Sequence, residues 1–235
     1  MVVHDTLSQS NTHLSPRILI MAKILSHGDW SAFQQNPLSG LRPEYLAQCL
    51  EPLQIQDEAL FRRTVAADSH RAAFMELVQQ TLGLKPLSSL TPSPLQISLL
   101  SLDARAWQRV LEACGLMYWA PVLAQELRAS VLRALETRFG PTWWTWVQTG
   151  CAVLGDKVPE QQRVWPETAH AWEIEIVDAG HAVLNTWIAR QDEGVAAWLR
   201  CKQAMPRQAQ EGGQVEAALA TMLLDAVAQT PRAEA

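Results

Sequence analysis

The sequence lacks the patterns that identify most nucleotide-binding enzymes and nucleic-acid-binding proteins. Its glycines form no phosphate-binding loop, and its serines lie outside the strand-turn-helix context of a nucleophile. There is no run of Lys and Arg, and the formal net charge of -5 gives no general attraction to a phosphate backbone. We therefore expect no nucleic-acid partner.

Closely spaced cysteines are also missing. Cys49, Cys114, Cys151 and Cys201 lie tens of residues apart, without the pairing of a zinc site or the density of a disulfide framework. Each lies in an apolar stretch typical of a core thiol. We predict reduced, mostly buried thiols in a reducing compartment.

No apolar stretch is long enough to span a bilayer. The most apolar window, residues 111–124, is interrupted by Glu112 and Pro121, well short of roughly 20 apolar residues. The first residues, MVVHDTLSQSNTHLSPR, lack the basic start and apolar run of a secretory signal. We expect a soluble, cytoplasmic protein without direct membrane insertion.

The apolar residues that are present recur at helical spacing, and no stretch alternates as a strand would. The fold class expected is all-α, an irregular multi-helix domain around one core with a small N-terminal helical subdomain. The segment KPLSSLTPSPLQ is rich in proline and serine and predicts a linker. The predicted divisions are an N-terminal helical segment 1–84, the linker 85–96, and a Trp-rich C-terminal domain 97–235.

Individual helices follow from caps, breakers and periodicity. We predict helices over 17–28, from Pro43, over 57–83, from Asp103, over 123–140, over 141–155, from 166 onward, and over 214–229. In the helix that follows Pro166, one face carries Trp172, Ile176, Gly180, Val183 and Trp187. That face requires a second layer of helices to cover it.

Tryptophan is the strongest signal, with 10 in the chain and three within GPTWWTWV. On a helix Trp143 and Trp146 lie about 60° apart, whereas Trp144 is displaced about 100° the other way. A single core stripe does not accommodate all three indoles. We predict that Trp143 and Trp146 belong to the core and that Trp144 lies at a groove or partner surface.

Candidate catalytic and metal-binding groups have weaker support. His170, Glu173, Asp178 and His181 lie on one predicted helix, and Asp178 and His181 have the spacing of half a di-metal carboxylate site. Glu173 and Asp178, however, diverge by about 140° around the helix axis. A Cys-His nucleophile pair also remains open, because its members need not be close in sequence. We favour a solvated flank and core thiols, with no metal and no cofactor.

The block from 94 to 147 resembles the YscK/SctK family of type III secretion proteins. In that family a Leu-rich helix with a small-residue turn precedes a basic amphipathic helix, then Leu/Phe-Gly, then an aromatic-rich helix. The matching residues here are Leu111, Gly115, Leu116, Leu127, Val131, Leu132, Leu135, Phe139, Gly140, Trp143, Trp144 and Trp146. Residues 33–50 are similar to the family's N-terminal segment, and the region after 155 departs most.

The resemblance implies a non-enzymatic cytoplasmic adaptor of the sorting platform, peripheral to the secretion apparatus at the inner membrane. Its implied partners are the inner-membrane ring protein and the pod protein that binds the ATPase stator. We predict that Trp144, Arg128 and Arg133 contribute to partner binding. Two alternatives stay open: another all-α binding module such as a secretion chaperone or regulator, and an enzyme with a site assembled from scattered His and carboxylates.

Overall fold

The structure, a computed structural model, is all-α. It describes residues 30–35, 37, 41–50, 68–155, 165–203 and 215–229. Of the described residues 76% are helical, in 11 α-helices, and none of them forms a strand. The expected fold class is therefore confirmed.

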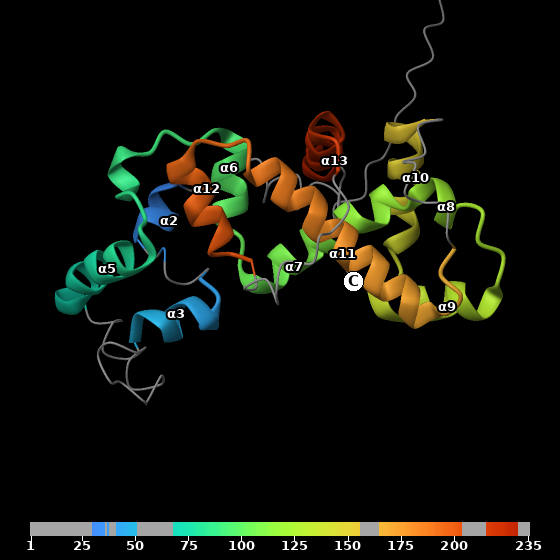
Figure 1. The fold of residues 1–235 in the computed structure, drawn as a ribbon, viewed down its shortest axis with the longest axis horizontal. Helices are drawn as coiled ribbons and strands as arrows, with labels where there is room; N and C mark the ends of the chain where they lie inside the picture. The colour runs from blue at the N-terminus through green and yellow to red at the C-terminus, as the bar shows by residue number, and fades with distance from the viewer. Residues whose placement is uncertain are drawn as a thin grey trace, which may run out of the picture.

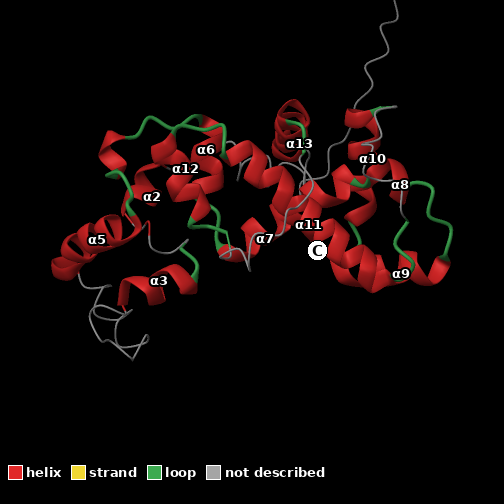
Figure 2. Cartoon of the chain, in the orientation of Figure 1, coloured by secondary structure: helices red, strands yellow, loops and turns green. Residues whose placement is uncertain are grey.

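The helices form two groups joined by a central pair (Figures 1 and 2). The central pair is α7 and α11, with α13 packed across it, and one end of the molecule is formed by α8, α9 and α10. The opposite end contains α2, α3, α5, α6 and α12. The bounds are α2 Trp30–Gln35, α3 Pro43–Leu50, α5 Asp68–Leu82, α6 Pro94–Leu100, α7 Ala104–Tyr118, α8 Ala120–Leu123, α9 Ala129–Phe139, α10 Trp143–Leu154, α11 Ala169–Ile188, α12 Glu193–Arg200 and α13 Ala217–Gln229.

Several predicted starts and stops are confirmed. Pro43 is the first residue of α3, and the Asp103 side chain caps α7 by accepting a hydrogen bond from the Ala106 amide. Gly83 follows α5 with φ 63°, a conformation that glycine adopts at little cost. The predicted helix 17–28 and the first part of the predicted helix 57–83 lie outside the described residues.

The central pair is built on two glycines that face each other's helix. A Cβ on Gly115 of α7 would overlap the Ile176 carbonyl oxygen of α11, and a Cβ on Gly180 of α11 would overlap the Leu111 carbonyl oxygen of α7. Leu111 and Gly115 are four residues apart, as are Ile176 and Gly180, so each helix offers one turn to the other. The two backbones therefore touch with no side chain between them.

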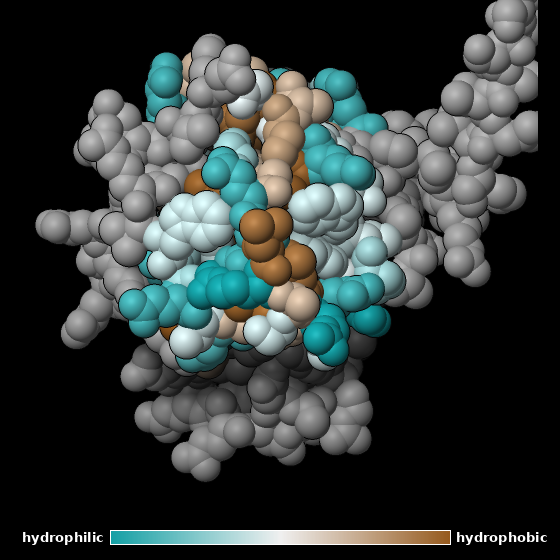
Figure 3. Space-filling model, turned by 90° about the vertical axis from the view of Figure 1, so that its right-hand side faces the viewer, coloured by the Kyte–Doolittle hydropathy of each residue, from teal (hydrophilic) through white to brown (hydrophobic). Residues whose placement is uncertain are grey.

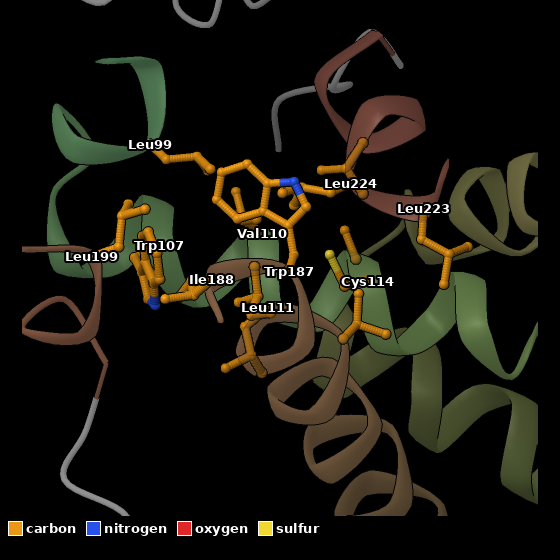
Figure 4. Close-up of a cluster of buried hydrophobic side chains, with 14 of the residues drawn as sticks. Leu99, Trp107, Val110, Leu111, Cys114, Trp187, Ile188, Leu199, Leu223 and Leu224 are labelled. Carbon is orange, nitrogen blue, oxygen red and sulfur yellow. The ribbon is translucent and has the colours of Figure 1, made fainter. Parts of the chain in front are cut away.

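Side chains on both sides of this crossing form the core. Figure 4 shows the Trp187 indole of α11 among Leu99 of α6, Val110 of α7 and Leu224 of α13. The predicted apolar face of α11 is buried along its whole length, including Trp172 and Ile176. One core cluster runs from Phe33 to Val227, so the residues before and after the predicted linker contribute to a common core.

The segment predicted as a linker is in contact with this core. Leu87 and Leu90 are buried, and the Trp198 indole nitrogen donates to the Lys85 carbonyl at 2.9 Å. Ser93 and Gln96 then form a capping box at the start of α6. Residues 85–96 are thus a short turn of 3-10 helix and a helix start, packed against α12.

The prediction of one helix over 123–140 is wrong in its first part. The chain leaves α8 at Leu123, and α9 begins only at Ala129, because Arg128 has an extended backbone with ψ 104°. The apolar periodicity continues through this turn, yet the buried Glu126 carboxylate, paired with the half-exposed Arg128 guanidinium, holds it out of helical conformation. The tertiary contact outweighs the local helix preference.

A buried lysine attaches the first helix to the rest. The Lys202 ammonium donates to the Leu102 carbonyl at 2.8 Å and lies 5.4 Å from the centre of the Phe33 ring in α2. Burial lowers the pKa of Lys202 to about 8. The backbone amide of Arg42 also donates to the Cys201 carbonyl at 3.2 Å, so the residues before α3 are tied to the end of α12.

The close approach of α7 and α11 predicts that the stability of the protein is sensitive to substitution of Gly115 and Gly180. Gly115→Ala and Gly180→Ala should each lower the free energy of unfolding by about 2 kcal/mol or more, because a carbonyl oxygen cannot move without separating the helices. Gly194→Ala is the matched control: its Cβ would meet the ends of the Leu90 and Lys85 side chains, which can rotate away. Urea unfolding measures all three, and equal effects at Gly115 and Gly194 would contradict the close backbone approach.

Candidate partner-binding surface

The three tryptophans of α10 are placed as their spacing predicts. Trp143 is buried and Trp146 packs partly buried against the core, whereas Trp144 is 39% exposed. The rings of Trp143 and Trp144 meet edge to face with centroids 5.3 Å apart. The exposed indole therefore rests on a buried one and is held at the surface.

The rest of the outward face of α10 is uncharged. Thr145, Gln148 and Ala152 are exposed beside Trp144, and no charged residue occurs between Phe139 and Gly155. Every other described helix of eight or more residues has at least one exposed charged side chain. Depletion of charge is characteristic of the centres of protein interfaces rather than of free surface.

A buried carboxylate organises the loop between α8 and α9. Glu126 is 4% exposed, and its Oε1 accepts from the Arg128 backbone amide at 2.9 Å and from the Arg128 Nε at 2.8 Å. Its Oε2 accepts from the Arg128 Nη2 at 2.5 Å and from the Trp172 indole nitrogen at 3.2 Å. These bonds, the side-chain ones from Arg128 first, lower the pKa of Glu126 to about 2.

The same arginine ties the loop to the start of α11. Arg128 Nη1 donates to the Glu167 carbonyl at 2.7 Å, and Nη2 donates to the Pro166 carbonyl at 2.8 Å. The guanidinium thus joins two segments that are almost 40 residues apart in the chain. The structure places Arg128 mainly in an internal clamp, although its side chain keeps 41% exposure.

Between the two members of this clamp, Leu127 points to solvent. It is 88% exposed, the highest value among the large apolar side chains of the described residues. Its neighbours in sequence are fixed on both sides by the Glu126–Arg128 pair, so the loop presents Leu127 in a defined position. Trp165, next to Pro166, is 40% exposed.

Figure 3 views this end of the molecule, where α8, α9 and α10 lie. A narrow apolar strip crosses the middle of the face and is bordered by pale and hydrophilic residues. Arg133 is exposed on α9, five residues after Arg128, and its Nε donates to the Ala129 carbonyl at 3.3 Å. We refer to Leu127, Arg128 and Arg133 as the Leu127 surface.

A second set of ion pairs, centred on Arg138, joins the end of α9 to its neighbours. Arg138 pairs with Glu173 of α11 and, at 3.1 Å, with Glu112 of α7. Glu173 also lies 3.7 Å from His170, and its pKa is lowered mainly by its hydrogen bond from Arg138. These groups join three helices.

The histidines and carboxylates of α11 are therefore divided among different neighbours. His181 lies eight residues beyond Glu173 on α11, and burial lowers its pKa despite the opposing effect of Asp178. Within the described ranges no three His, Cys, Asp or Glu side chains are grouped as metal ligands. The predicted half-site consisted of Asp178 and His181, and His170 lies eleven residues before His181 on the helix.

All four cysteines carry free thiols. Cys49, Cys114 and Cys201 are buried and Cys151 is partly buried, in agreement with the predicted core positions. Burial raises the pKa of Cys201 to about 12 and also raises the pKa of Cys49 and Cys151. A high pKa keeps the thiol protonated and poorly nucleophilic. As for membrane crossing, the described part of the chain contains no helix with the necessary length and hydropathy.

The sequence predicted the exposure of Trp144 but not the exposure of Leu127 or the Glu126 clamp. A single exposed leucine has no periodic signature, and the clamp depends on Trp172, which is 46 residues away. One available signal was the uncharged stretch from Phe139 to Gly155, since a surface helix normally carries charge.

No known family matches the sequence, and neither curated proteins nor solved structures gave a significant match.

Because Trp143 is buried and Trp144 is partly exposed, their removal should lower the free energy of unfolding by different amounts. Trp143→Ala should lower the free energy of unfolding by about 3 to 5 kcal/mol, because it empties a core site. Trp144→Ala should cost less, about 1 kcal/mol, because the indole is 39% exposed and its removal empties no core site. Thermal and urea unfolding at low protein concentration measure both. Equal losses would mean that α10 is buried on all sides.

The Glu126 clamp predicts a dependence of stability on pH. Because the pKa of Glu126 falls from 4.5 to about 2 on folding, its contribution is complete above pH 4.5 and is lost as the pH falls toward 2. Glu126→Gln should cost about 2 kcal/mol at pH 7, and the difference from wild type should shrink between pH 4.5 and 2.

Urea unfolding across that pH range is the measurement, with Glu175→Gln as control because Glu175 is an exposed carboxylate of α11. A constant difference between Glu126→Gln and wild type at all pH values would contradict the assigned ion pair.

Proposed function

We propose that this protein is a non-enzymatic adaptor of a type III secretion sorting platform, linking the inner-membrane ring protein to the pod protein that binds the ATPase stator. The secretion assignment rests on the resemblance of residues 94–147. The adaptor assignment rests on the Leu127 surface, where an apolar side chain is exposed on a loop held by the ion pair between the buried Glu126 carboxylate and Arg128.

The exposure of Leu127 is the observation that supports the binding proposal most directly. An 88% exposed leucine gains nothing for the folded monomer, because it remains in water in both folded and unfolded states. The loop around it is nevertheless fixed by a carboxylate and a guanidinium. An apolar side chain held in one position loses little conformational entropy when a partner covers it.

The two exposed arginines that follow Leu127 in sequence, Arg128 and Arg133, indicate the chemistry of the partner. Arg133 is exposed with its Nε on a backbone carbonyl, and Arg128 keeps part of its guanidinium in solvent. A suitable partner has an apolar socket for Leu127 with carboxylates at its rim. Rim charges of this kind orient the approach of a partner, and the apolar anchor supplies most of the affinity.

The rest of the fold suits a scaffold. The two ends of the molecule are joined by the α7–α11 pair, whose backbones touch at Gly115 and Gly180. The Arg138 group and the Arg128 clamp tie α9 to α11 from two directions. A partner that binds at the Leu127 surface therefore contacts a loop that is tied directly to the start of α11.

Copurification tests the proposal. The full chain should capture the pod protein, and Leu127→Ser should weaken capture about tenfold or more, as expected for an interface anchor. Unfolding of the variant should match wild type within about 0.5 kcal/mol, because Leu127 is exposed. The matched control is Met222→Ser, an exposed apolar residue of α13.

Three further results of the capture experiment support, relocate or overturn the proposed surface. Arg133→Glu should weaken capture more at low salt than at high salt, because the rim contact is electrostatic. Loss of capture with Met222→Ser but not with Leu127→Ser would move the surface to α13. If the wild-type chain captures neither the pod protein nor the ring protein, the adaptor proposal is overturned.

A further inference from the structure

Three buried side-chain nitrogen atoms have no hydrogen-bond acceptor. They are the Arg42 Nε, the Trp107 Nε1 and the Gln203 Nε2, and within the described ranges no other buried side-chain nitrogen or oxygen is unpaired. All three are N–H donors. Because buried donors in folded proteins are nearly always paired, a group of unpaired donors indicates a place where an acceptor binds.

Arg42 and Gln203 lie at the junction where α3 begins and α12 ends. The Arg42 backbone amide donates to the Cys201 carbonyl at 3.2 Å, and Gln203 follows Cys201 by two residues. Between them in sequence is Lys202, whose ammonium donates to the Leu102 carbonyl at 2.8 Å just before α7. We call Arg42, Lys202 and Gln203 the Arg42 junction.

The third unpaired donor belongs to α7. Trp107 is fully buried, and Figure 4 shows it in one cluster with Leu199 of α12, its indole nitrogen pointing away from Leu99. Gln203 follows Leu199 by four residues and is only 7% exposed. Two of the three unpaired donors therefore belong to side chains that are more than nine-tenths buried.

Positive charge at the Arg42 junction has little compensation. Arg42 is half-buried, and no ion pair joins its guanidinium to a described carboxylate. Burial lowers the pKa of Lys202 to about 8, against the effect of Asp103, and burial together with Arg42 lowers the pKa of His181, against the effect of Asp178. Asp103 and Asp178 are both exposed. Cations withdrawn from water are stabilised by an anion that also accepts their hydrogen bonds.

We propose that the Arg42 junction binds a small oxyanion of the phosphate class, which accepts hydrogen bonds from the Arg42 guanidinium and the Gln203 amide. A guanidinium presents parallel donors that match two oxygens of such an anion. The remaining oxygens of a tetrahedral anion accept from donors in other directions. Lys202 and His181 contribute positive charge to the site. This site is independent of the adaptor proposal, because Leu127 lies at the opposite end of the molecule (Figure 1).

The test uses the full chain with inorganic phosphate as the probe. When phosphate replaces chloride at constant ionic strength, the midpoint of thermal unfolding should rise and saturate, because the ligand binds the folded state. Arg42→Gln should raise the phosphate dissociation constant about tenfold or more. Arg105→Gln, at an exposed arginine of α7, is the matched control and should leave the dissociation constant unchanged.

A second variant keeps the result clear if Arg42→Gln lowers stability. Gln203→Glu has nearly the same shape and places a carboxylate where the proposal places the anion. This variant should be at least as stable as wild type without phosphate, and phosphate should not raise its unfolding midpoint.

NMR titration of His181 gives a further measurement. A bound anion favours the imidazolium, so phosphate should raise the pKa of His181 in wild type. The same addition should leave the pKa of His181 unchanged in Gln203→Glu. An unchanged His181 pKa in phosphate-saturated wild type would place the anion elsewhere and overturn the assignment.

The remaining outcomes are decisive in either direction. A wild-type midpoint that phosphate does not raise overturns the site, and so does equal phosphate affinity in wild type and Arg42→Gln. A saturable response to acetate but not to phosphate overturns the phosphate class. Sulfate should act as phosphate does, because both are tetrahedral oxyanions. Capture of the pod protein by Arg42→Gln should match wild type, so a failure of one proposal is distinguishable from a failure of the other.

Discussion

The contact between the backbones of α7 and α11 is the constraint on which the other packing depends. Gly115 and Gly180 allow the two helices to meet without intervening side chains, and the tryptophans and leucines on either side then reach one another. Because α7 is buried along most of its length, further helices must pack around it. Gly150 permits a close approach of α10 as well, since a Cβ there would lie 2.5 Å from the Met117 carbonyl oxygen of α7.

Polar groups in this protein act mainly as internal ties. Glu126 and Arg128 hold the turn before α9, Arg138 joins α9 to α7 and α11, and Lys202 attaches α2 to the end of α12. These interactions leave one end of the molecule with an exposed leucine and an uncharged helix face. The exposed Leu127 and the uncharged outward face of α10 distinguish that end from the rest of the described surface.

The sequence predicted much of the fold, since helix caps and periodicity are local properties. The start of α7 at Asp103 and the buried face of α11 were both predictable. The turn at Leu123–Arg128 was not, because its periodicity favours a helix and the carboxylate that breaks it bonds to distant Trp172. Trp144 was predictable from angles alone. Leu127 was not, because a single leucine gives no sign of its exposure.

The lysine beneath Phe33 gives the protein an internal chemical reporter. With a pKa of about 8, a substantial fraction of the Lys202 amine is uncharged, and hence nucleophilic, in mildly alkaline buffer. Lys202 is 3% exposed, so an acylating reagent reaches its amine only after a local opening of the packing around it, which includes Phe33 of α2. The rate of its modification therefore measures how often that part of the molecule opens, independently of global unfolding.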